Sequence, residues 1–209
     1  MEKLAKKITL WFKDNLILNE EQAEVIEYSI ISLLLLLFNF FFLSFFCWIF
    51  GVLKLGVTAA LTAVFFRSVT GGAHLSAPWR CMFISSLLPT VFGLVGKYIS
   101  PNFPERWLIL FLLCCFILNL ILVQKFAPAE VKERPLRSEQ KRRFKLLGLV
   151  FTGLWLMLVM LLVQFEHKDL VVASALGFLW QGVTLTPSGF HIYKQLSNLG
   201  TKKEGKVRS

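Results

Sequence analysis

Charged residues are scarce in this chain of 209 residues. Only 17% are Asp, Glu, Lys or Arg, whereas a soluble domain carries about a quarter. Hydrophobic residues make up 56% of the chain and include 21 phenylalanines, and the mean hydropathy is +0.63. A water-soluble globule has no interior large enough for that much hydrocarbon. The shortage of charge therefore argues against a soluble enzyme and predicts an integral membrane protein.

Histidine and cysteine are also few. There are three histidines and no His-Glu-x-x-His run, which argues against a zinc peptidase site, so we expect no metal and no cofactor. Three of the four cysteines, Cys47, Cys114 and Cys115, lie inside apolar runs, which excludes a secreted disulfide framework. Cysteine chemistry is therefore expected at the fourth, Cys81.

Long apolar runs are abundant. The first, from Tyr28 to Phe50, holds 23 residues without a charge, enough for a helix to cross a hydrocarbon core of about 30 Å. Further runs predict an all-α integral membrane protein with about six transmembrane helices. We expect one membrane domain over residues 1–209, with a basic cytoplasmic tail at 187–209 and spans at about 28–50, 51–66, 82–99, 107–123, 146–165 and 170–186.

The N-terminal residues are amphipathic. Leu4, Ile8, Trp11 and Phe12 recur at helical spacing, and the lysines fall mainly on the other side. This pattern favours a helix lying in the membrane interface, in contact with anionic lipids. The alternative is a solvated polar start to the first span.

Basic residues gather on one side of the predicted topology. With the N-terminus inside, the inner segments 1–27, 67–80, 124–145 and 187–209 hold nineteen of the 23 Lys and Arg residues, and the outer segments hold four. This bias places both termini in the cytoplasm of a multi-pass protein of the cell membrane. The net charge of +10 is thus explained by orientation and lipid contact, and we expect no nucleic acid partner.

One cytoplasmic segment concentrates reactive side chains. His74 and Cys81 are the pair that thiol catalysis requires, because an imidazole can take the thiol proton and return it to a leaving amine. On a continuous helix the two would lie about 10 Å apart along the axis. Pro78 instead predicts that a helix starts there with Cys81 in its first turn, and Gly71 and Gly72 predict a turn that folds His74 back towards the sulfur.

Simpler explanations exist for each of these residues. A cysteine at the end of a span is often a small packing residue, and a histidine in a membrane loop often sits at the interface. Asn119 and Gln181 lie within predicted spans, where either could orient His74 or could bond one helix to another. His167 and His191 are expected to be solvated.

At this segment the sequence resembles the accessory gene regulator B (AgrB) family of membrane cysteine endopeptidases. The family pattern is an Arg, then Gly-Gly-x-His, then a Cys seven residues after the His. It is filled by Arg67, Gly71, Gly72, His74 and Cys81. Residues 125–130, Lys-Phe-Ala-Pro-Ala-Glu, resemble the family's aromatic-Ala-Pro-Ala segment, which a basic stretch follows.

The resemblance implies an activity. Cys81 and His74 would cleave the C-terminal tail from a quorum-sensing precursor peptide of the AgrD type through a thioester. An internal Cys or Ser of the peptide would then close a thiolactone or lactone. The resemblance also implies a homodimer. Arg67, Gly71 and Gly72 would support the oxyanion or the substrate, and an acidic tail would meet the basic loop, for which the candidate residues are Lys125, Pro128, Lys141, Arg142 and Arg143.

Two other classes of protein remain open. A small membrane transporter or peptide exporter without catalysis would use the six spans as a pathway. It predicts ionisable residues in the middle of the spans, but the basic residues in the predicted runs are only Lys54 and Lys97, each near the end of its run. A non-catalytic scaffold would leave the Gly-Gly-x-His and Cys cluster unexplained.

Overall fold

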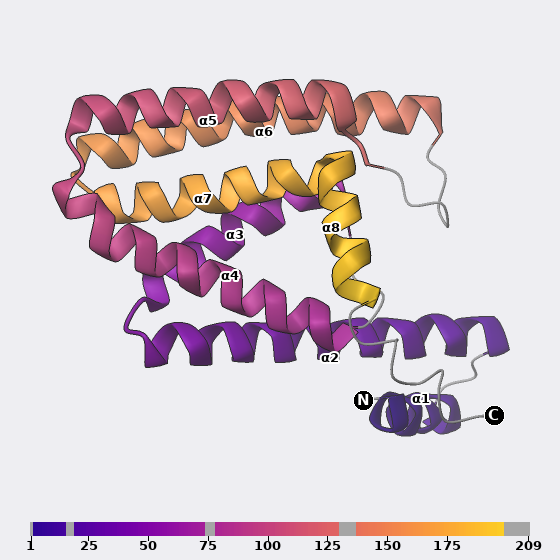
Figure 1. Ribbon diagram of the computed structural model, residues 1–209. Helices are drawn as coiled ribbons and strands as arrows, with labels where there is room; N and C mark the ends of the chain where they lie inside the picture. Colours follow the sequence, from indigo (N-terminus) through magenta and orange to yellow (C-terminus); the bar gives the residue numbers. More distant parts are fainter. Residues whose placement is uncertain (1, 16–18, 74–77, 130–136, 199–209) are drawn as a thin grey trace, which may run out of the picture.

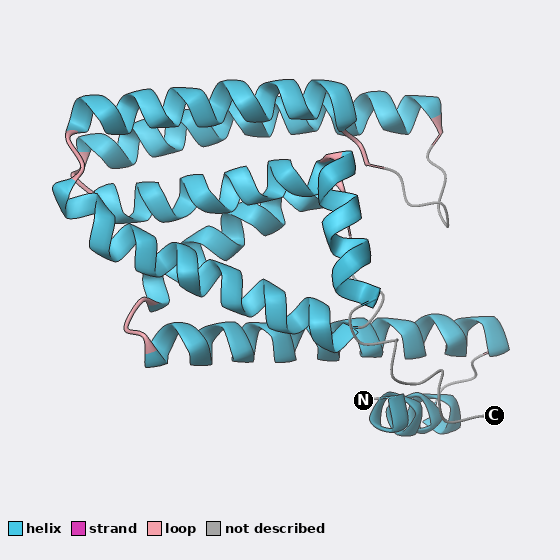
Figure 2. Cartoon of the chain, in the orientation of Figure 1, coloured by secondary structure: helices cyan, strands magenta, loops and turns pink. Residues whose placement is uncertain are grey.

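The computed structural model describes residues 2–15, 19–73, 78–129 and 137–198. Within these ranges the chain is helical and forms no strand (Figure 2), which confirms the all-α prediction. The helices are α1 (Glu2–Asn15), α2 (Glu20–Ile49), α3 (Leu53–Thr70), α4 (Pro78–Ile99), α5 (Glu105–Phe126), α6 (Ser138–Gln164), α7 (Lys168–Leu185) and α8 (Pro187–Asn198), with a 3₁₀ turn η1 (Ser100–Asn102) after α4.

Five helices of the described chain, α2 to α6, are long and apolar enough to cross a membrane. The sixth candidate is α7, which reaches that criterion only together with α8, and the two are bent by 87° at their junction. Each of the six predicted apolar runs overlaps one of the helices α2 to α7. The architecture is therefore that of a multi-pass membrane protein with a short helix set across one end.

Helix α7 lies in the middle of the bundle (Figure 1), with α5 and α6 on one side and α3 and α4 on the other. Its Phe178 stacks on Trp155 of α6, with ring centroids 3.9 Å apart, and meets Phe66 of α3 edge-on at 4.5 Å. The indole N–H of Trp155 donates to the hydroxyl of Ser174 at 3.0 Å. Aromatic packing and one interhelical hydrogen bond thus join three helices in the core.

Small residues let α3 and α7 approach closely. A Cβ at Gly177 of α7 would lie 2.3 Å from the carbonyl oxygen of Ala59 on α3, so only glycine fits at this crossing. Such contacts drive helix association in membranes, where lipid competes for apolar surface. The position of α7 against α3 is therefore held by backbone contact, which matters because both helices end at the candidate site.

Successive spanning helices run in opposite directions, so α3, α5 and α7 end where α4 and α6 begin. Helix α8 lies across this same end of the bundle, and α1 lies beside the N-terminal part of α2 near that end (Figure 1). The helix α1 packs against α2, and Lys13 forms an ion pair with Glu20. Both short helices therefore lie near the end that carries Cys81, and the position of α1 beside α2 suits a helix in the membrane interface.

Several helices extend beyond the apolar runs. The start of α2 at Glu20 follows Asn19, which forms a capping box with Gln22. Because α6 starts at Ser138, the basic residues 141–143 lie in its first two turns instead of in a loop. Residues 187–198, expected as part of a basic tail, form α8.

Candidate functional site

The chain leaves α3 through two glycines in unusual backbone conformations. The φ angle is +71° at Gly71 and +142° at Gly72, both in the region that favours glycine. The N–H of Gly71 closes the helix on the carbonyl of Arg67 at 3.0 Å. The predicted turn is therefore present, and it directs residues 71–73, the Gly-Gly-Ala segment, away from the axis of α3.

The Gly-Gly-Ala segment is tied to the end of α7. The amide nitrogen of Gln181 donates to the carbonyl of Gly71 at 2.7 Å and to the hydroxyl of Thr70 at 3.2 Å. The N–H of Ala73 donates to the carbonyl of Thr184 at 3.1 Å. Both amide hydrogens of Gln181 are thus engaged, so this residue positions the segment, which fits the interhelical alternative for Gln181 better than a role in orienting His74.

The guanidinium of Arg67 also serves this segment. Its Nη2 donates to the carbonyl of Ala73, while the residue itself sits in the last turn of α3. One of its donors is therefore committed to the backbone next to His74. This bond gives Arg67 a role in shaping the segment that differs from the expected contact with an oxyanion or a substrate carboxylate.

Cys81 lies in the first turn of α4, which begins at Pro78 as predicted. The side chain is half-buried in a small cluster formed by residues from four segments, which we call the Cys81 cluster. Its members are Ala73, Cys81, Ile84, Trp180, Tyr193 and Leu196. The residue that immediately precedes His74, Ala73, thus belongs to the same cluster as the cysteine. His74 itself, with residues 75–77, lies outside the described residues.

Helix α8, which was not predicted from the sequence, contributes two residues to this cluster. Its Tyr193 is buried, and its ring centroid lies 6.3 Å from that of Trp180. The far end of α8 is held by Arg80, whose Nη1 donates to the carbonyls of Leu196 at 3.3 Å and Ser197 at 2.7 Å. The signal was available, since Thr186 before Pro187 is a helix start and residues 190, 193 and 196 recur at helical spacing.

The remaining cysteines and histidines lie elsewhere. Cys47 and Cys115 are buried, as expected of packing residues, but Cys114 is exposed on the outer surface of α5. His167 and His191 are exposed, as expected. The buried Asn119 bonds back to the carbonyl of its own helix at 3.3 Å. Among the described residues, no group of three or more His, Cys, Asp or Glu side chains could hold a metal ion.

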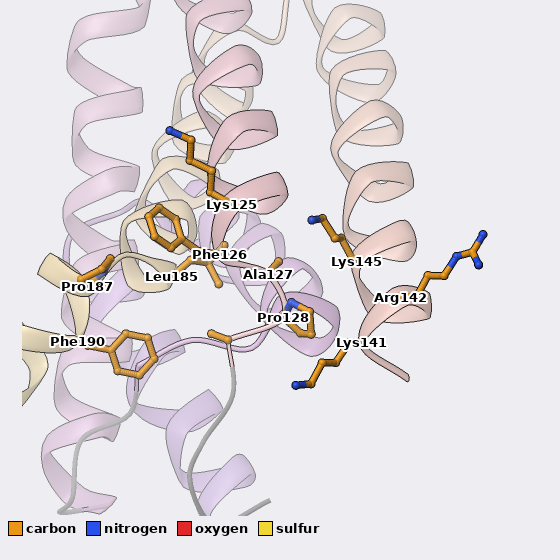
Figure 3. Close-up of a pocket in the computed structure, with 11 residues that line it drawn as sticks. Lys125, Phe126, Ala127, Pro128, Lys141, Arg142, Lys145, Leu185, Pro187 and Phe190 are labelled. Carbon is orange, nitrogen blue, oxygen red and sulfur yellow. The ribbon is translucent and has the colours of Figure 1, made fainter. Parts of the chain in front are cut away.

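A cavity of about 780 Å³ opens beside the Gly-Gly-Ala segment. Figure 3 shows its two kinds of lining. Apolar side chains come from the ends of α5 and α7, from the loop after α5 and from α8, and basic side chains come from α5 and α6. The apolar lining is Phe126, Ala127, Pro128, Ala129, Leu185, Pro187 and Phe190, and the basic lining is Lys125, Lys141, Arg142 and Lys145. No described residue of the lining is acidic, so the cavity suits an anionic ligand with apolar groups.

The cavity brings together most of the residues predicted to bind the substrate. Lys125, Pro128, Lys141 and Arg142 line it, although the guanidinium of Arg142 points outward (Figure 3). Arg143 does not line it. Lys145 was not among the predicted residues, because its place on the inner side of α6 depends on how α6 packs, which the sequence alone does not show.

The cavity and the Cys81 cluster share structural elements. Ala129, which lines the cavity, donates its N–H to the carbonyl of Thr70 at 2.9 Å and pairs with Gly71 as an isolated β-bridge. On α8, Phe190 faces the cavity, whereas Tyr193, one turn later, faces Cys81. A ligand in the cavity would therefore lie next to the segment that leads to the candidate nucleophile.

Comparison with known proteins agrees with this geometry. The family model described as Accessory gene regulator B matches residues 5–185. Relatives named "Putative AgrB-like protein" occur in Clostridium perfringens (24% identical, covering 97% of this chain and 99% of the relative) and in Halalkalibacterium halodurans (29% identical, 85% and 82%). A third, from Listeria innocua, is 30% identical and covers 69% of this chain and 67% of the relative. No solved structure matches the chain.

The protein is thus a multi-pass membrane protein with a cysteine-bearing site at one end of its helix bundle. The chain belongs to the accessory gene regulator B family, whose model spans nearly all of it. Membership places the protein in the accessory gene regulator system of quorum sensing and implies an AgrD-like precursor peptide as its substrate.

Proposed function

We propose that this protein is a membrane-embedded cysteine endopeptidase that removes the C-terminal tail of an AgrD-type precursor and promotes closure of a thiolactone or lactone ring. The observation that carries the proposal is the Cys81 cluster, which contains both Ala73 and Cys81. Because His74 is the next residue, the cluster supports a short distance between the imidazole and the thiol. Two side chains suited to acyl transfer then share one end of the bundle.

In the proposed reaction His74 takes the proton of the Cys81 thiol, and the sulfur attacks the carbonyl carbon of the scissile peptide bond. The carbon–nitrogen bond breaks, the imidazolium gives its proton to the leaving amine, and the tail departs, leaving a thioester on Cys81. An internal thiol or hydroxyl of the peptide then attacks that thioester, which closes the ring and frees Cys81. Exchange of one thioester for another is nearly isoenergetic, so the enzyme must mainly position the two groups and exclude water.

The cavity beside the site is the proposed docking surface for the acidic tail. Its basic residues would attract carboxylates, and its apolar floor would take the hydrophobic side chains between them. The bridge between Ala129 and Gly71 supports this role, because a tail bound in the cavity lies next to the Gly-Gly-Ala segment. The scissile bond is then held near Cys81.

The site is proposed to face the cytoplasm, where both termini would also lie. The support is the excess of basic residues in the segments at this end of the bundle, which the positive-inside rule assigns to the cytoplasmic side. The amphipathic α1 would lie on the anionic inner leaflet, in contact with lipid headgroups. The leader of a precursor peptide bound to the same leaflet would reach the enzyme by diffusion in the plane of the membrane.

Co-expression with an AgrD-type peptide tests the proposal. We expect Cys81→Ala and His74→Ala to abolish tail release, and Cys114→Ala to keep it, because Cys114 is an exposed thiol on the outer surface of α5. The peptide should be followed by mass spectrometry, with protein levels matched by immunoblot. Tail release by Cys81→Ala would show that another group is the nucleophile.

A further inference from the structure

The side chain of Tyr193 has a place in the Cys81 cluster that the proposed function does not use. It is buried, with 6% of its surface exposed, and it comes from α8, the short helix bent by 87° from α7. It belongs to the same cluster as Ala73 and Cys81, so it lies beside both the segment that leads to His74 and the candidate nucleophile. A phenol in such a place has a hydroxyl available for chemistry at the sulfur.

The neighbours of this hydroxyl determine which way it can donate. The Arg67 guanidinium and the Trp180 indole both face the Tyr193 oxygen, and both groups carry hydrogen-bond donors but no acceptor. The phenol oxygen must therefore be the acceptor in these contacts, and its own hydrogen is left for a partner elsewhere. Cys81 is the remaining polar member of the cluster, so the hydrogen of the Tyr193 hydroxyl is available on the side of the candidate nucleophile.

The protonation of Tyr193 fits a donor. Burial raises the pKa of the Tyr193 hydroxyl above its ordinary value, and the positive charge of Arg67 opposes the shift only in part. The hydroxyl consequently keeps its proton at neutral pH. A neutral phenol can donate a strong hydrogen bond to a developing negative charge.

The helix that carries Tyr193 is anchored at both ends. At its start the N–H of Gly189 donates to the hydroxyl of Thr186 at 3.0 Å, and at its far end Arg80 holds the carbonyls of Leu196 and Ser197. A side chain in the middle of such a helix is held in place before the substrate arrives. Fixed donors of this kind stabilise a transition state without a cost of reorganisation.

We propose that Tyr193 is the oxyanion donor of this active site, with Arg67 and Trp180 holding its hydroxyl in position. The inference rests on the proposed function. When the Cys81 sulfur adds to the scissile carbonyl, the electron pair of the double bond moves onto the oxygen, and the Tyr193 O–H donates a hydrogen bond to that oxygen without losing its proton. When the intermediate collapses, the carbon–oxygen double bond reforms and the carbon–nitrogen bond breaks.

The test uses the full-length protein in lipid nanodiscs with a synthetic precursor peptide. For Tyr193→Phe we expect kcat for tail release to fall about a hundredfold, as loss of one oxyanion donor does in other enzymes, while KM changes less than about threefold. The matched control is Tyr98→Phe, since Tyr98 is 66% exposed near the opposite end of α4. A kcat of Tyr193→Phe within about threefold of wild type overturns the proposal.

A second substrate separates a donor from a packing residue. Replacing the scissile carbonyl oxygen by sulfur gives a thioamide, whose sulfur is a weaker hydrogen-bond acceptor than oxygen. The wild type should therefore cleave the thioamide more slowly than the amide, whereas Tyr193→Phe, already slow on the amide, should show little further loss on the thioamide. Equal losses in both enzymes would assign Tyr193 a purely structural role. The two claims fail on different results. The proposed function fails if Cys81→Ala still cleaves the peptide, whereas this inference fails if Tyr193→Phe behaves like the wild type while Cys81→Ala is inactive.

Discussion

Two glycines at the end of α3 determine how the chain approaches Cys81. A side chain at Gly72 would face two obstacles, because its φ angle of +142° disfavours any L residue and its Cβ would lie 2.8 Å from the hydroxyl of Thr184. The strain of such a conformation is about 1–3 kcal/mol. The segment that carries His74 is therefore positioned through backbone that only glycine adopts easily.

Substitution of Gly72 should therefore impair catalysis more than folding. We expect Gly72→Ala to lower tail release at least about tenfold, since about 1.4 kcal/mol lost at the transition state corresponds to that factor. The control is Gly153→Ala, because a Cβ at Gly153 has no neighbour within 4 Å. Tail release should be measured on purified protein, with thermal unfolding in detergent recorded alongside. Wild-type activity in Gly72→Ala would mean that the conformation of the segment is unimportant.

For individual residues, the sequence predicted those features that depend only on residues nearby in the chain. Pro78 marks the start of α4 and the glycine pair marks a turn because both act through the local backbone. Gln181 and Tyr193 could not be assigned in the same way. Gly71, the partner of Gln181, and Cys81, a neighbour of Tyr193, each lie more than a hundred residues away along the chain, and only the packing of α7 and α8 brings them together.

At the scale of helices, the first turns of α6 present neighbouring basic residues to different surroundings. Lys145 lines the cavity and its amine points toward the end of α5 (Figure 3), whereas Arg143 is exposed and does not line it. Both contribute equally to the positive charge of this end. Substituting each residue in turn therefore distinguishes a role in docking the peptide from a role in orienting the protein in the membrane.

We expect Lys145→Glu to raise KM for the precursor about three- to tenfold with little change in kcat, because the cavity would bind the tail equally in the ground and transition states. Arg143→Glu makes the same change in net charge and should leave KM near the wild-type value. Salt should reduce the difference, since exposed charges are screened. Equal effects of both substitutions on KM would indicate that the overall positive charge of this end attracts the peptide, and not a docking cavity.

The lengths of the helices were harder to predict than the number of spans. Apolar runs mark only the part of a helix that meets hydrocarbon, and α2 and α6 continue into water through polar residues that start at Asn19 and Arg137. For α8 the obstacle was its short and mixed sequence. It is stabilised by contacts such as those of Arg80, which composition does not reveal.

For the whole molecule, orientation in the membrane follows from the distribution of charge. The end that holds the Cys81 cluster carries the segments with nineteen of the 23 basic residues, so we expect it to face the cytoplasm. In intact cells a membrane-impermeant maleimide should label His167→Cys, at the opposite end, and should label Glu139→Cys only after permeabilisation. Both positions are exposed. The reverse pattern of labelling would invert the topology.

The membrane class and the approximate number of spanning helices could be predicted because hydropathy and charge bias act along the whole chain. The site could be predicted only as a set of residue types with a known spacing. Its three-dimensional form depends on α7, whose glycines and buried polar residues bring α3, α5 and α8 to one point. Such convergence is a property of packing and has no local signature.

The central claim is that Cys81 forms a thioester with the peptide, and the most direct measurement is mass spectrometry of the enzyme after brief reaction with a precursor whose internal Cys is replaced by Ala. Without that nucleophile the acyl-enzyme should accumulate. We predict an adduct on Cys81 with the mass of the peptide lacking its tail, removable by hydroxylamine and absent from Cys81→Ala. Release of the tail with no such adduct, or with the adduct on another residue, would contradict the claim.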